Sequence, residues 1–244
     1  MICLSIVTVV KGDLGRLRKT IRSVPIHPKV QHLIKLLPYD ISSEDLLSEF
    51  PHLNVHVLDD RGIYDAMNQS IALASGDWLL FLNAGDTLMP GVIDLLVYFS
   101  QCPDDFLGFK FLASVDGCVL VERASPLYFT RHMLNHQSIL YSRAAFNECK
   151  FDPGLKVVGD LKHCLESGLY DSLGYVDLPI ILYDTICNYA LKPSSIKRNW
   201  SERLRAYRWR VSPYVALLIS LIACIGYLHS HILRPWLSVS KHSS

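Results

Sequence analysis

Apolar residues in the first part of the chain follow strand-like and helix-like spacings in turn. Residues 2–10 form a run rich in strand-favouring side chains, which predicts a first strand. Leu17, Ile21 and Val24 then recur on one helical face, and Pro25 predicts that this helix stops before it. The two segments together predict a first strand–helix unit.

Two further strands are predicted at residues 32–37 and 54–58. The segment between them predicts a short helix capped by Ser42 or Ser43, with three apolar residues facing inward: Leu46, Leu47 and Phe50. Because strands and helices alternate, we expect these strands to lie parallel in one sheet.

The stretch from residue 62 to residue 86, GIYDAMNQSIALASGDWLLFLNAGD, carries the most information in the chain. Its first part predicts a helix, with Asp65 in the first turn and three apolar residues on one face: Met67, Ile71 and Ala74. Gly76 is expected to follow the end of the helix as a left-handed stop.

An unbroken apolar run at residues 78–82 comes next and is typical of a strand covered on both faces. Asn83 begins a short run of small residues, and Asp86 is the first charge beyond the strand. Asp86 is therefore expected at a strand's carboxyl end, where open α/β sheets bind ligands and where a carboxylate suits a hard metal ion. Alternatively, Asp86 and Thr87 form a cap or turn before a helix at residues 91–100.

The pattern changes after Asp105. Residues 109–115 and 118–122 flank Asp116-Gly117, a dipeptide that strongly favours a hairpin. The second half of the domain is therefore expected to be built partly from antiparallel strands.

The composition of the chain excludes some classes of protein. A chain of 244 residues, 50% of them hydrophobic, can bury a substantial core, and a formal net charge of +1 argues against a general nucleic-acid binder. Seven cysteines are scattered without zinc-ligand or redox spacing, which predicts reduced core residues of a cytoplasmic protein. The residues after Met1 enter a strand-like run without a basic region or cleavage site, so no signal peptide is expected.

Several blocks of the sequence stand out as motifs: SIVTVV at residues 5–10, GIYDAMN and FLNAGD within residues 62–86, HQSILYSRAAF at residues 136–146, and FDPGLKVVGDLKHCLESG at residues 151–168. Together they resemble the family-2 glycosyltransferases, especially short bacterial exopolysaccharide and O-antigen enzymes of the colanic-acid type. The resemblance implies a GT-A fold, a Rossmann-like α/β architecture with a mixed sheet flanked by helices. It implies a nucleotide-sugar-binding half at residues 1–105 and an acceptor-binding, catalytic-base half at residues 106–190.

The same resemblance implies an inverting enzyme that moves one sugar from a nucleotide-diphosphate donor, expected to be a UDP-sugar. The implied acceptor is a polyprenyl-diphosphate-linked saccharide of bacterial surface-polysaccharide synthesis. A sugar nucleotidyltransferase is disfavoured, because Lys11-Gly12-Asp13 is too slight for a phosphate-binding loop. The alternative from another class is a catalytically inactive, membrane-associated subunit of a polysaccharide assembly complex.

Two acidic residues would carry the implied chemistry. Asp86 would hold Mg²⁺ or Mn²⁺ beside the donor diphosphate, and Asp160 would be the base that accepts the proton of the attacking hydroxyl. Asp160 could equally cap the helix that follows it, and Asp152 and Glu166 are weaker candidates for the base.

The remaining site residues carry over from the family by position. The expected donor-pocket residues are Thr8, Val9, Asp65, Asn68, Asn83, His136 and Gln137. The alternatives are a helix-dipole role for Asp65 and a hydrogen-bonded core position for His136. The acidic, glycine-rich run usual after the second strand is replaced by LLPYDISSED at residues 36–45, where Asp40 is the expected substitute for the nucleobase-contacting aspartate.

The C-terminal region, residues 191–244, is expected to associate with a membrane. Its basic and aromatic stretch at residues 192–210 suits an anionic surface, where each cation near the lipid contributes about 1 kcal/mol. An uncharged segment follows at residues 214–233, and its apolar centre, residues 215–228, is shorter than the roughly 20 residues that span a bilayer. The expected location is the cytoplasmic face of the inner membrane, and the alternative is a helix buried on the domain or on another subunit.

Overall fold

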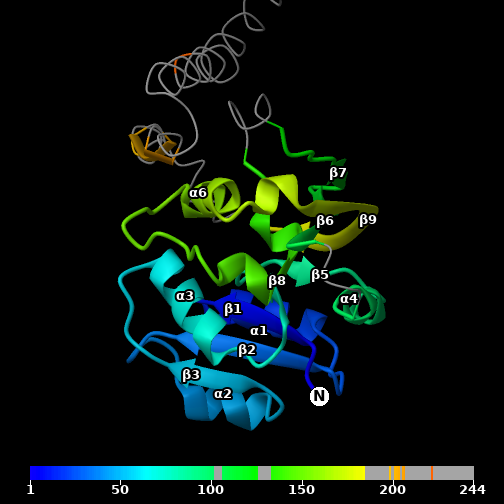
Figure 1. Ribbon diagram of the computed structural model, residues 1–244. Coiled ribbons are helices and arrows are strands. Elements are labelled where there is room, and N and C mark those ends of the chain that lie inside the picture. The colour runs from blue at the N-terminus through cyan, green and yellow to red at the C-terminus, as the bar shows by residue number, and fades with distance from the viewer. Residues whose placement is uncertain are drawn as a thin grey trace, which may run out of the picture.

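The computed structural model describes residues 1–101, 106–125 and 133–184, together with residues 198, 201–203, 205, 206 and 221. The strands are β1 (Leu4–Val9), β2 (Val30–Leu36), β3 (Asn54–Val57), β4 (Trp78–Phe81), β5 (Thr87–Leu88), β6 (Gly108–Val115), β7 (Cys118–Leu120), β8 (Ile139–Ser142) and β9 (Leu173–Tyr183). The helices are α1 (Leu14–Ser23), α2 (Ser43–Glu49), α3 (Ile63–Leu73), α4 (Ile93–Phe99) and α6 (Gly159–Glu166), with short 3-10 turns η1 (His136–Ser138), η2 (Arg143–Phe146) and η3 (Leu169–Asp171). These described strands all join one mixed sheet (Figure 1).

The first half of the sheet is parallel, in the order β3-β2-β1-β4. The helices between its strands begin at polar caps, and for α2 the cap is Ser42, one of the two predicted residues. Asp13 caps α1 by accepting a hydrogen bond from the Arg16 N–H at 2.9 Å, and Ser42 caps α2 in the same way. The predicted alternation of strand and helix, and the parallel pairing, are confirmed.

The second half of the sheet is mixed. Strand β8 lies antiparallel between β4 and β6, whereas β9 runs parallel to β6 and pairs with β5 at the edge. Strands β6 and β7 form the predicted hairpin, in which Asp116 and Gly117 have positive φ values of 48° and 82°. The expected change to antiparallel strands after residue 105 is confirmed.

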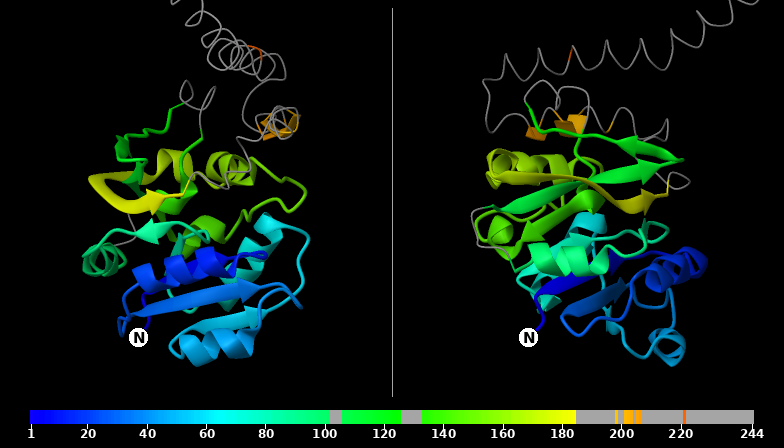
Figure 2. Two further views of the ribbon diagram at one scale, coloured as in Figure 1. Left: turned by 180° about the vertical axis from the view of Figure 1, so that it is seen from behind. Right: turned by 90° about the vertical axis from the view of Figure 1, so that its right-hand side faces the viewer.

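Helices cover the sheet on both sides, and each side buries its own apolar side chains (Figure 2). On one face, α3, η2 and α6 pack over β1, β4 and β8, around Val7, Phe81 and Tyr141. On the other face, α1 and α2 pack over β2, while α4 packs over β4 and β6. This double cover explains why β4 is apolar throughout and completely buried.

Three details of the fold differ from the sequence-based expectation. Gly76 is not left-handed; a Cβ there would lie 2.7 Å from the backbone of Leu4, so close packing against β1 requires glycine. Leu47 is 37% exposed, because α2 turns only Leu46 fully into the core. Of the described cysteines, Cys164 is a buried core residue as predicted, whereas Cys3 and Cys149 are half-buried and Cys118 is exposed on the β6–β7 hairpin.

Candidate functional site

The loop after β4 is fixed to α1 by one threonine. The buried Thr20 hydroxyl accepts a hydrogen bond from the Gly85 N–H at 2.8 Å and donates one to the Asp86 carbonyl oxygen at 2.7 Å. Gly85 has a φ of 107°, which favours glycine, and a Cβ there would collide with the side chains of Arg16 and Asp184. The loop is therefore held in a conformation that presents Asp86 just beyond the carboxyl end of β4.

Asp86 is a buried carboxylate with one oxygen that lacks a partner. The residue is 2% exposed; its Oδ1 accepts a hydrogen bond from the Asp184 N–H at 2.7 Å, whereas Oδ2 has no partner among the described residues. Burial raises the pKa of Asp86 to about 6, although the hydrogen bond from Asp184 opposes this shift. The alternative role as a helix cap is wrong, because β5 intervenes and Val92 is the N-cap of α4. The alternative of a turn holds at the backbone, where the Asp86 N–H donates to the Asn83 carbonyl oxygen at 3.0 Å. A buried acceptor oxygen without a donor suits a cation.

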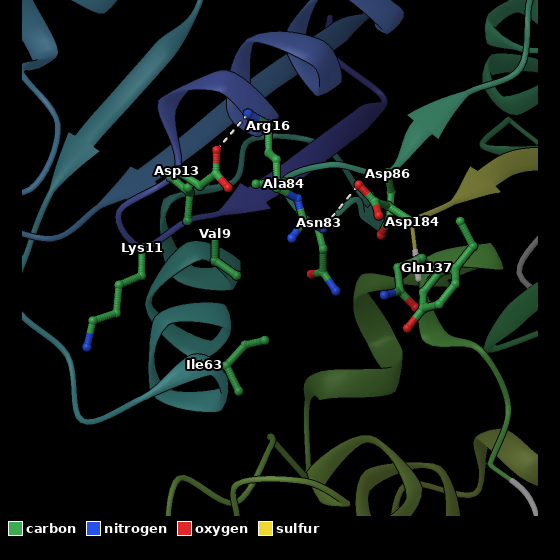
Figure 3. Close-up of a pocket in the computed structure, with 12 residues that line it drawn as sticks. Val9, Lys11, Asp13, Arg16, Ile63, Asn83, Ala84, Asp86, Gln137 and Asp184 are labelled. Atoms are coloured by element: carbon green, nitrogen blue, oxygen red, sulfur yellow. Dashed lines mark hydrogen bonds and ion pairs between the residues drawn. The ribbon is translucent and has the colours of Figure 1, made fainter. Parts of the chain in front are cut away.

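An open cavity of about 300 Å³ lies beside this loop, at the carboxyl ends of β1 and β4 (Figure 3). Four of the predicted site residues line it together: Val9, Asn83, Asp86 and Gln137. Its other walls come from the beginnings of α1 and α3 and from the end of β9. Cavities of this size hold small organic ligands, and this one lies where open α/β sheets bind them.

Charged side chains of both signs line the cavity. Lys11 and Arg16 are positive, and Asp13, Asp86 and Asp184 are negative, so the lining carries one excess negative charge when all five are ionised. A divalent cation at Asp86 would reverse that sign and favour an anionic ligand such as a diphosphate. The described residues contain no cluster of three or more His, Cys, Asp or Glu side chains that could hold a metal. The unpartnered Oδ2 atom of Asp86 is a donor that fits a cation held by one protein carboxylate, with ligand and water oxygens completing its shell.

The Asp160 carboxylate belongs to a second cluster of acid–base groups. Its Oδ1 accepts hydrogen bonds from the Tyr64 hydroxyl at 3.1 Å and from the Leu161 N–H at 2.9 Å. Its Oδ2 lies 3.2 Å from His136 Nδ1, and the His136 Nε2 atom is buried without a partner in the described part of the chain. The N-cap residue of α6 is Val158 and not Asp160, although the Asp160 carboxylate accepts the Leu161 N–H of the first turn.

Tyr64 can approach Asp160 because Gly159 has no side chain. A Cβ at Gly159 would lie 2.6 Å from the Tyr64 ring. Burial, and next the charge of Asp160, raise the pKa of Tyr64 well above its usual value, so the hydroxyl stays protonated and donates. The GIYDAMN and VVGD segments therefore meet at this hydrogen bond.

The weaker candidates for the base have a different environment. Asp152 and Glu166 both pair with Lys162, at 2.8 and 3.7 Å, and Asp152 is 36% exposed. Of the three carboxylates, Asp160 is the one beside an imidazole and a phenol.

Gln137 and Tyr183 lie in the cavity wall and connect it with the second cluster. The Gln137 side chain hydrogen-bonds the Tyr183 phenol. Burial, followed by the charges of Asp86 and Asp160, raises the pKa of Tyr183 to about 12. The negative charges of both carboxylates therefore act on this phenol. Asp160 and His136 themselves are outside the lining of the cavity.

A buried ion pair holds the turn η1, which carries the predicted His-Gln pair. Lys110 Nζ lies 2.7 Å from Glu122 Oε2 and donates a hydrogen bond to Ser138 Oγ at 2.6 Å. The Glu122 carboxylate accepts the Asn135 N–H at 3.0 Å. Burial lowers the pKa of Lys110, and the negative charge of Glu122 opposes that shift. Both ends of η1 are therefore anchored to the same pair of charges.

Thr8 and Asp65 lie outside the lining of the cavity. Thr8 is fully buried, and its Oγ1 lies 3.2 Å from His32 Nε2. Asp65 lies in the first turn of α3 and accepts hydrogen bonds from the backbone and the side chain of Arg61, at 3.0 and 3.2 Å. This geometry agrees with the helix-terminus role weighed for Asp65, and donor contact by either residue stays a prediction.

Asn68 and Asp40 join segments that are distant in the sequence. Asn68 exchanges two hydrogen bonds with the Phe151 backbone, which fastens α3 to the segment before α6. Asp40 accepts a hydrogen bond from the Gly12 N–H at 2.6 Å, next to Lys11 in the cavity wall. Asp40 is thus near the cavity, and its predicted contact with the nucleobase stays a prediction.

Sequence reasoning missed several residues of these clusters, among them Arg16, Tyr64, Tyr183 and Asp184. Tyr64 stands inside the GIYDAMN block, which was a usable signal. Arg16 is one of several cations on α1, and Asp184 reaches Asp86 across 98 positions of sequence, so neither carries a local signal.

The described part of the C-terminal region contacts the rest of the fold near α6. Glu202 is 4% exposed and accepts hydrogen bonds from the backbone N–H groups of residues 156–158, at 2.8–3.2 Å, while Ala206 is buried in the cluster around α6. Among the residues that the structure describes, no helix combines the length and apolarity needed to cross a membrane. The predicted membrane segment at residues 214–233 lies outside the described residues, apart from Leu221.

Comparison with known sequences gives short matches. No protein-family model matches the chain. PGL/p-HBAD biosynthesis glycosyltransferases of Mycobacterium bovis and Mycobacterium tuberculosis are 56% identical over 36 residues, which are 15% of this chain and 14% of each relative. The chain therefore matches about one seventh of the length of these curated relatives.

Solved structures match over nearly the whole chain. S. aureus TarS 1-349 in complex with UDP-GlcNAc has a TM-score of 0.69 at 11% identity, covering 94% of this chain and 73% of that one. The mannosyltransferase PcManGT from Pyrobaculum calidifontis, in complex with GDP-Man and Mn²⁺, has a TM-score of 0.58 at 10% identity, covering 98% and 79%. The predicted GT-A-like mixed α/β fold is confirmed, and the closer likeness to colanic-acid enzymes stays a prediction.

Proposed function

We propose that this protein is an inverting, divalent-metal-dependent glycosyltransferase that uses a nucleotide-diphosphate sugar. The observation that carries the proposal is the unpartnered Oδ2 atom of Asp86, a buried residue in the wall of a ligand-sized cavity beyond β4. Support also comes from the shared fold with proteins solved with UDP-GlcNAc, or with GDP-Man and Mn²⁺. The short match to mycobacterial glycosyltransferases points to the same class of enzyme.

In the proposed reaction, the acceptor oxygen forms a bond to the anomeric carbon as the bond from that carbon to the donor phosphate breaks. The bonding electrons leave with the nucleoside diphosphate, and attack from the opposite face inverts the anomeric configuration. Asp160 takes the proton of the attacking hydroxyl, while Tyr64 and His136 orient its carboxylate. Asp86 would hold Mg²⁺ or Mn²⁺, which when bound supplies positive charge beside the leaving diphosphate.

For the acceptor we propose a saccharide on a polyprenyl diphosphate, used in bacterial surface-polysaccharide synthesis at the cytoplasmic face of the inner membrane. The support is the basic, aromatic stretch at residues 192–210 followed by the uncharged segment at residues 214–233. Deleting residues 213–244 should lower the fraction of the protein that sediments with membranes. An unchanged membrane fraction would contradict this location.

Calorimetric titration with nucleotide diphosphates tests the donor site, with UDP as the first ligand. We expect wild-type protein to bind one nucleotide at least about tenfold more tightly with Mn²⁺ than without it, a difference of about 1.4 kcal/mol. Asp86→Asn should lose this metal-dependent part, since the amide oxygen can still accept the Asp184 N–H but the anionic oxygen is gone. Asp94→Asn is the matched control, because Asp94 is 85% exposed and outside the cavity wall.

The outcomes separate the candidate functions. If a nucleotide binds equally well with and without Mn²⁺, and equally well to wild-type protein and Asp86→Asn, the role of Asp86 as a metal ligand is contradicted. The proposal of a nucleotide-sugar site would then still stand. Failure of UDP, GDP and ADP to bind under either condition would favour the alternative, a catalytically inactive membrane-associated subunit of a polysaccharide assembly complex.

A further inference from the structure

Arg16 is a cation in the cavity wall with an unused donor. It lies in the first turn of α1, and its side chain is 20% exposed. The Nε atom is buried and has no hydrogen-bond partner among the described residues. A guanidinium presents five N–H donors in a planar fork, and leaving a buried donor unpaired is unfavourable. The guanidinium as a whole is a partly exposed cation in the cavity wall, and it therefore suits an anionic ligand that enters the cavity.

Asp184 connects Arg16 to the proposed metal ligand. Arg16 Nη2 lies 3.3 Å from Asp184 Oδ2, and the Asp184 side chain is only 8% exposed. The backbone N–H of the same residue donates to Asp86 Oδ1 at 2.7 Å. Figure 3 shows the Arg16 and Asp184 side chains meeting from opposite sides, close to Asp86. Asp184 thus sets the position of the guanidinium relative to the Asp86 carboxylate.

The loop after β4 leaves space for the Arg16–Asp184 ion pair, because Gly85 in this loop has no side chain. Gly85 has a φ of 107°, and any Cβ at this position would collide with both Arg16 and Asp184. Because Gly85 has no side chain, the Arg16 guanidinium and the Asp184 carboxylate can pack against it, close to the Asp86 carboxylate. Lys11, the other cation of the cavity wall, lies at the end away from Gln137 and Asp184 (Figure 3).

We infer that Arg16 binds the diphosphate of the donor and that Asp184 is the positioning residue that aims its guanidinium. This inference rests on the proposed function, because it takes a nucleotide diphosphate as the ligand of the cavity. Arginine forms strong, charge-assisted and often bidentate hydrogen bonds to phosphate oxygens. Bond cleavage leaves an additional negative charge on the departing diphosphate, and Arg16 remains beside it as a fixed positive charge.

The test compares the ligands of one nucleotide series on wild-type and variant protein with Mn²⁺ present. The series is the best-binding diphosphate among UDP, GDP and ADP, then its monophosphate and its nucleoside. Arg16→Gln should weaken diphosphate binding by about tenfold or more and leave nucleoside binding unchanged. Arg16→Lys keeps the positive charge but not the planar set of N–H donors, so its diphosphate affinity should lie between those of wild-type protein and Arg16→Gln. Asp184→Asn, which keeps the backbone N–H to Asp86, should weaken diphosphate binding less than Arg16→Gln does.

Arg18→Gln is the matched control on the same helix, because Arg18 pairs with Glu49 at 2.6 Å outside the cavity wall. It should bind the diphosphate as wild-type protein does. Equal diphosphate affinity in wild-type protein, Arg16→Gln and Arg16→Lys would overturn the inference and leave the proposed function standing. Equal losses for the diphosphate and the nucleoside would also overturn it, because they would indicate a general disturbance of the cavity. Wild-type protein that binds no nucleotide diphosphate would overturn the proposed function and this inference together.

Discussion

The Nδ1 atom of His136 lies 3.2 Å from Oδ2 of Asp160, and both side chains are largely buried. The Tyr64 hydroxyl donates to the other oxygen of Asp160 at 3.1 Å. The carboxylate proposed as the base is therefore held by two side chains that come from different parts of the chain. His136 is followed in η1 by Gln137, which lines the cavity, so this arrangement orients a proton acceptor behind the cavity wall.

Replacing Asp160 should separate catalysis from donor binding. Asp160→Asn is expected to lower the rate of sugar transfer by about 100- to 1,000-fold, the usual contribution of a positioned base. Nucleotide affinity should stay unchanged, because Asp160 is outside the cavity wall. Tyr64→Phe keeps the ring contact with Phe151 and removes one hydrogen bond, so its loss of rate should be about tenfold. Asp152→Asn is the control, and a rate lost there but kept in Asp160→Asn would assign the base to Asp152.

Two glycines with positive φ should respond differently to alanine. Gly85→Ala introduces a Cβ that collides with Arg16 and Asp184, so we expect it to lower the free energy of unfolding by about 2–3 kcal/mol. Gly91 has a φ of 77°, and no atom of the described residues would lie within 4 Å of a Cβ there, so Gly91→Ala should cost about 1 kcal/mol. Urea denaturation measures both values. An equal loss of unfolding free energy in the two variants would mean that Arg16 and Asp184 do not pack against Gly85 as described.

Glu202 should stabilise the fold as the acceptor for the segment before α6. Glu202→Ala leaves the N–H groups of residues 156–158 without their carboxylate, which should cost about 2–4 kcal/mol of unfolding free energy. Glu202→Gln keeps an oxygen acceptor and should lose about half as much. Glu148 is exposed, so Glu148→Ala should change stability by less than about 0.5 kcal/mol. Unfolding curves of Glu202→Ala that match wild type would show that this contact contributes nothing in solution.

The buried imidazole of His32 should make the protein sensitive to mild acid. Burial, and secondarily the charge of His52, lower the pKa of His32 from 6.5 to about 3. The folded state therefore binds this proton less readily than the unfolded state, so the stability linked to neutral His32 is complete above pH 6.5. It is lost as the pH falls from 6.5 towards 3.

His32→Gln removes this titration and keeps a polar partner for Thr8. Between pH 7.5 and pH 5, wild-type protein should lose about 2 kcal/mol more unfolding free energy than the variant. Denaturant titrations at the two pH values measure the difference. His163, whose pKa burial lowers to about 4, remains in both proteins and contributes equally. Identical pH dependence in the two proteins would contradict a neutral, buried His32.

The order of strands and helices could be predicted from the chain because its signals are local. Apolar spacing places α1 and α3, the unbroken apolar run places β4, and Asp116-Gly117 places the β6–β7 turn within one or two residues. The same local reading puts Asp86 just past the end of β4. Where local reading fails, as at Gly76, the cause is packing against β1, a segment more than seventy positions away.

The membership of the site depends on contacts between distant segments, and only the folded arrangement decides it. Val9, Asn83 and Gln137 reach the cavity, whereas Thr8 and Asn68 bond to other parts of the protein, and no local pattern separates these two groups. The physical reason is that the pairing of β9 with β5 and β6 brings its end, and with it Asp184, beside Asp86, 98 positions earlier. Spacing along the chain therefore specified the elements and the acidic strand end, while the arrangement of charges around it arose from sheet pairing and helix packing.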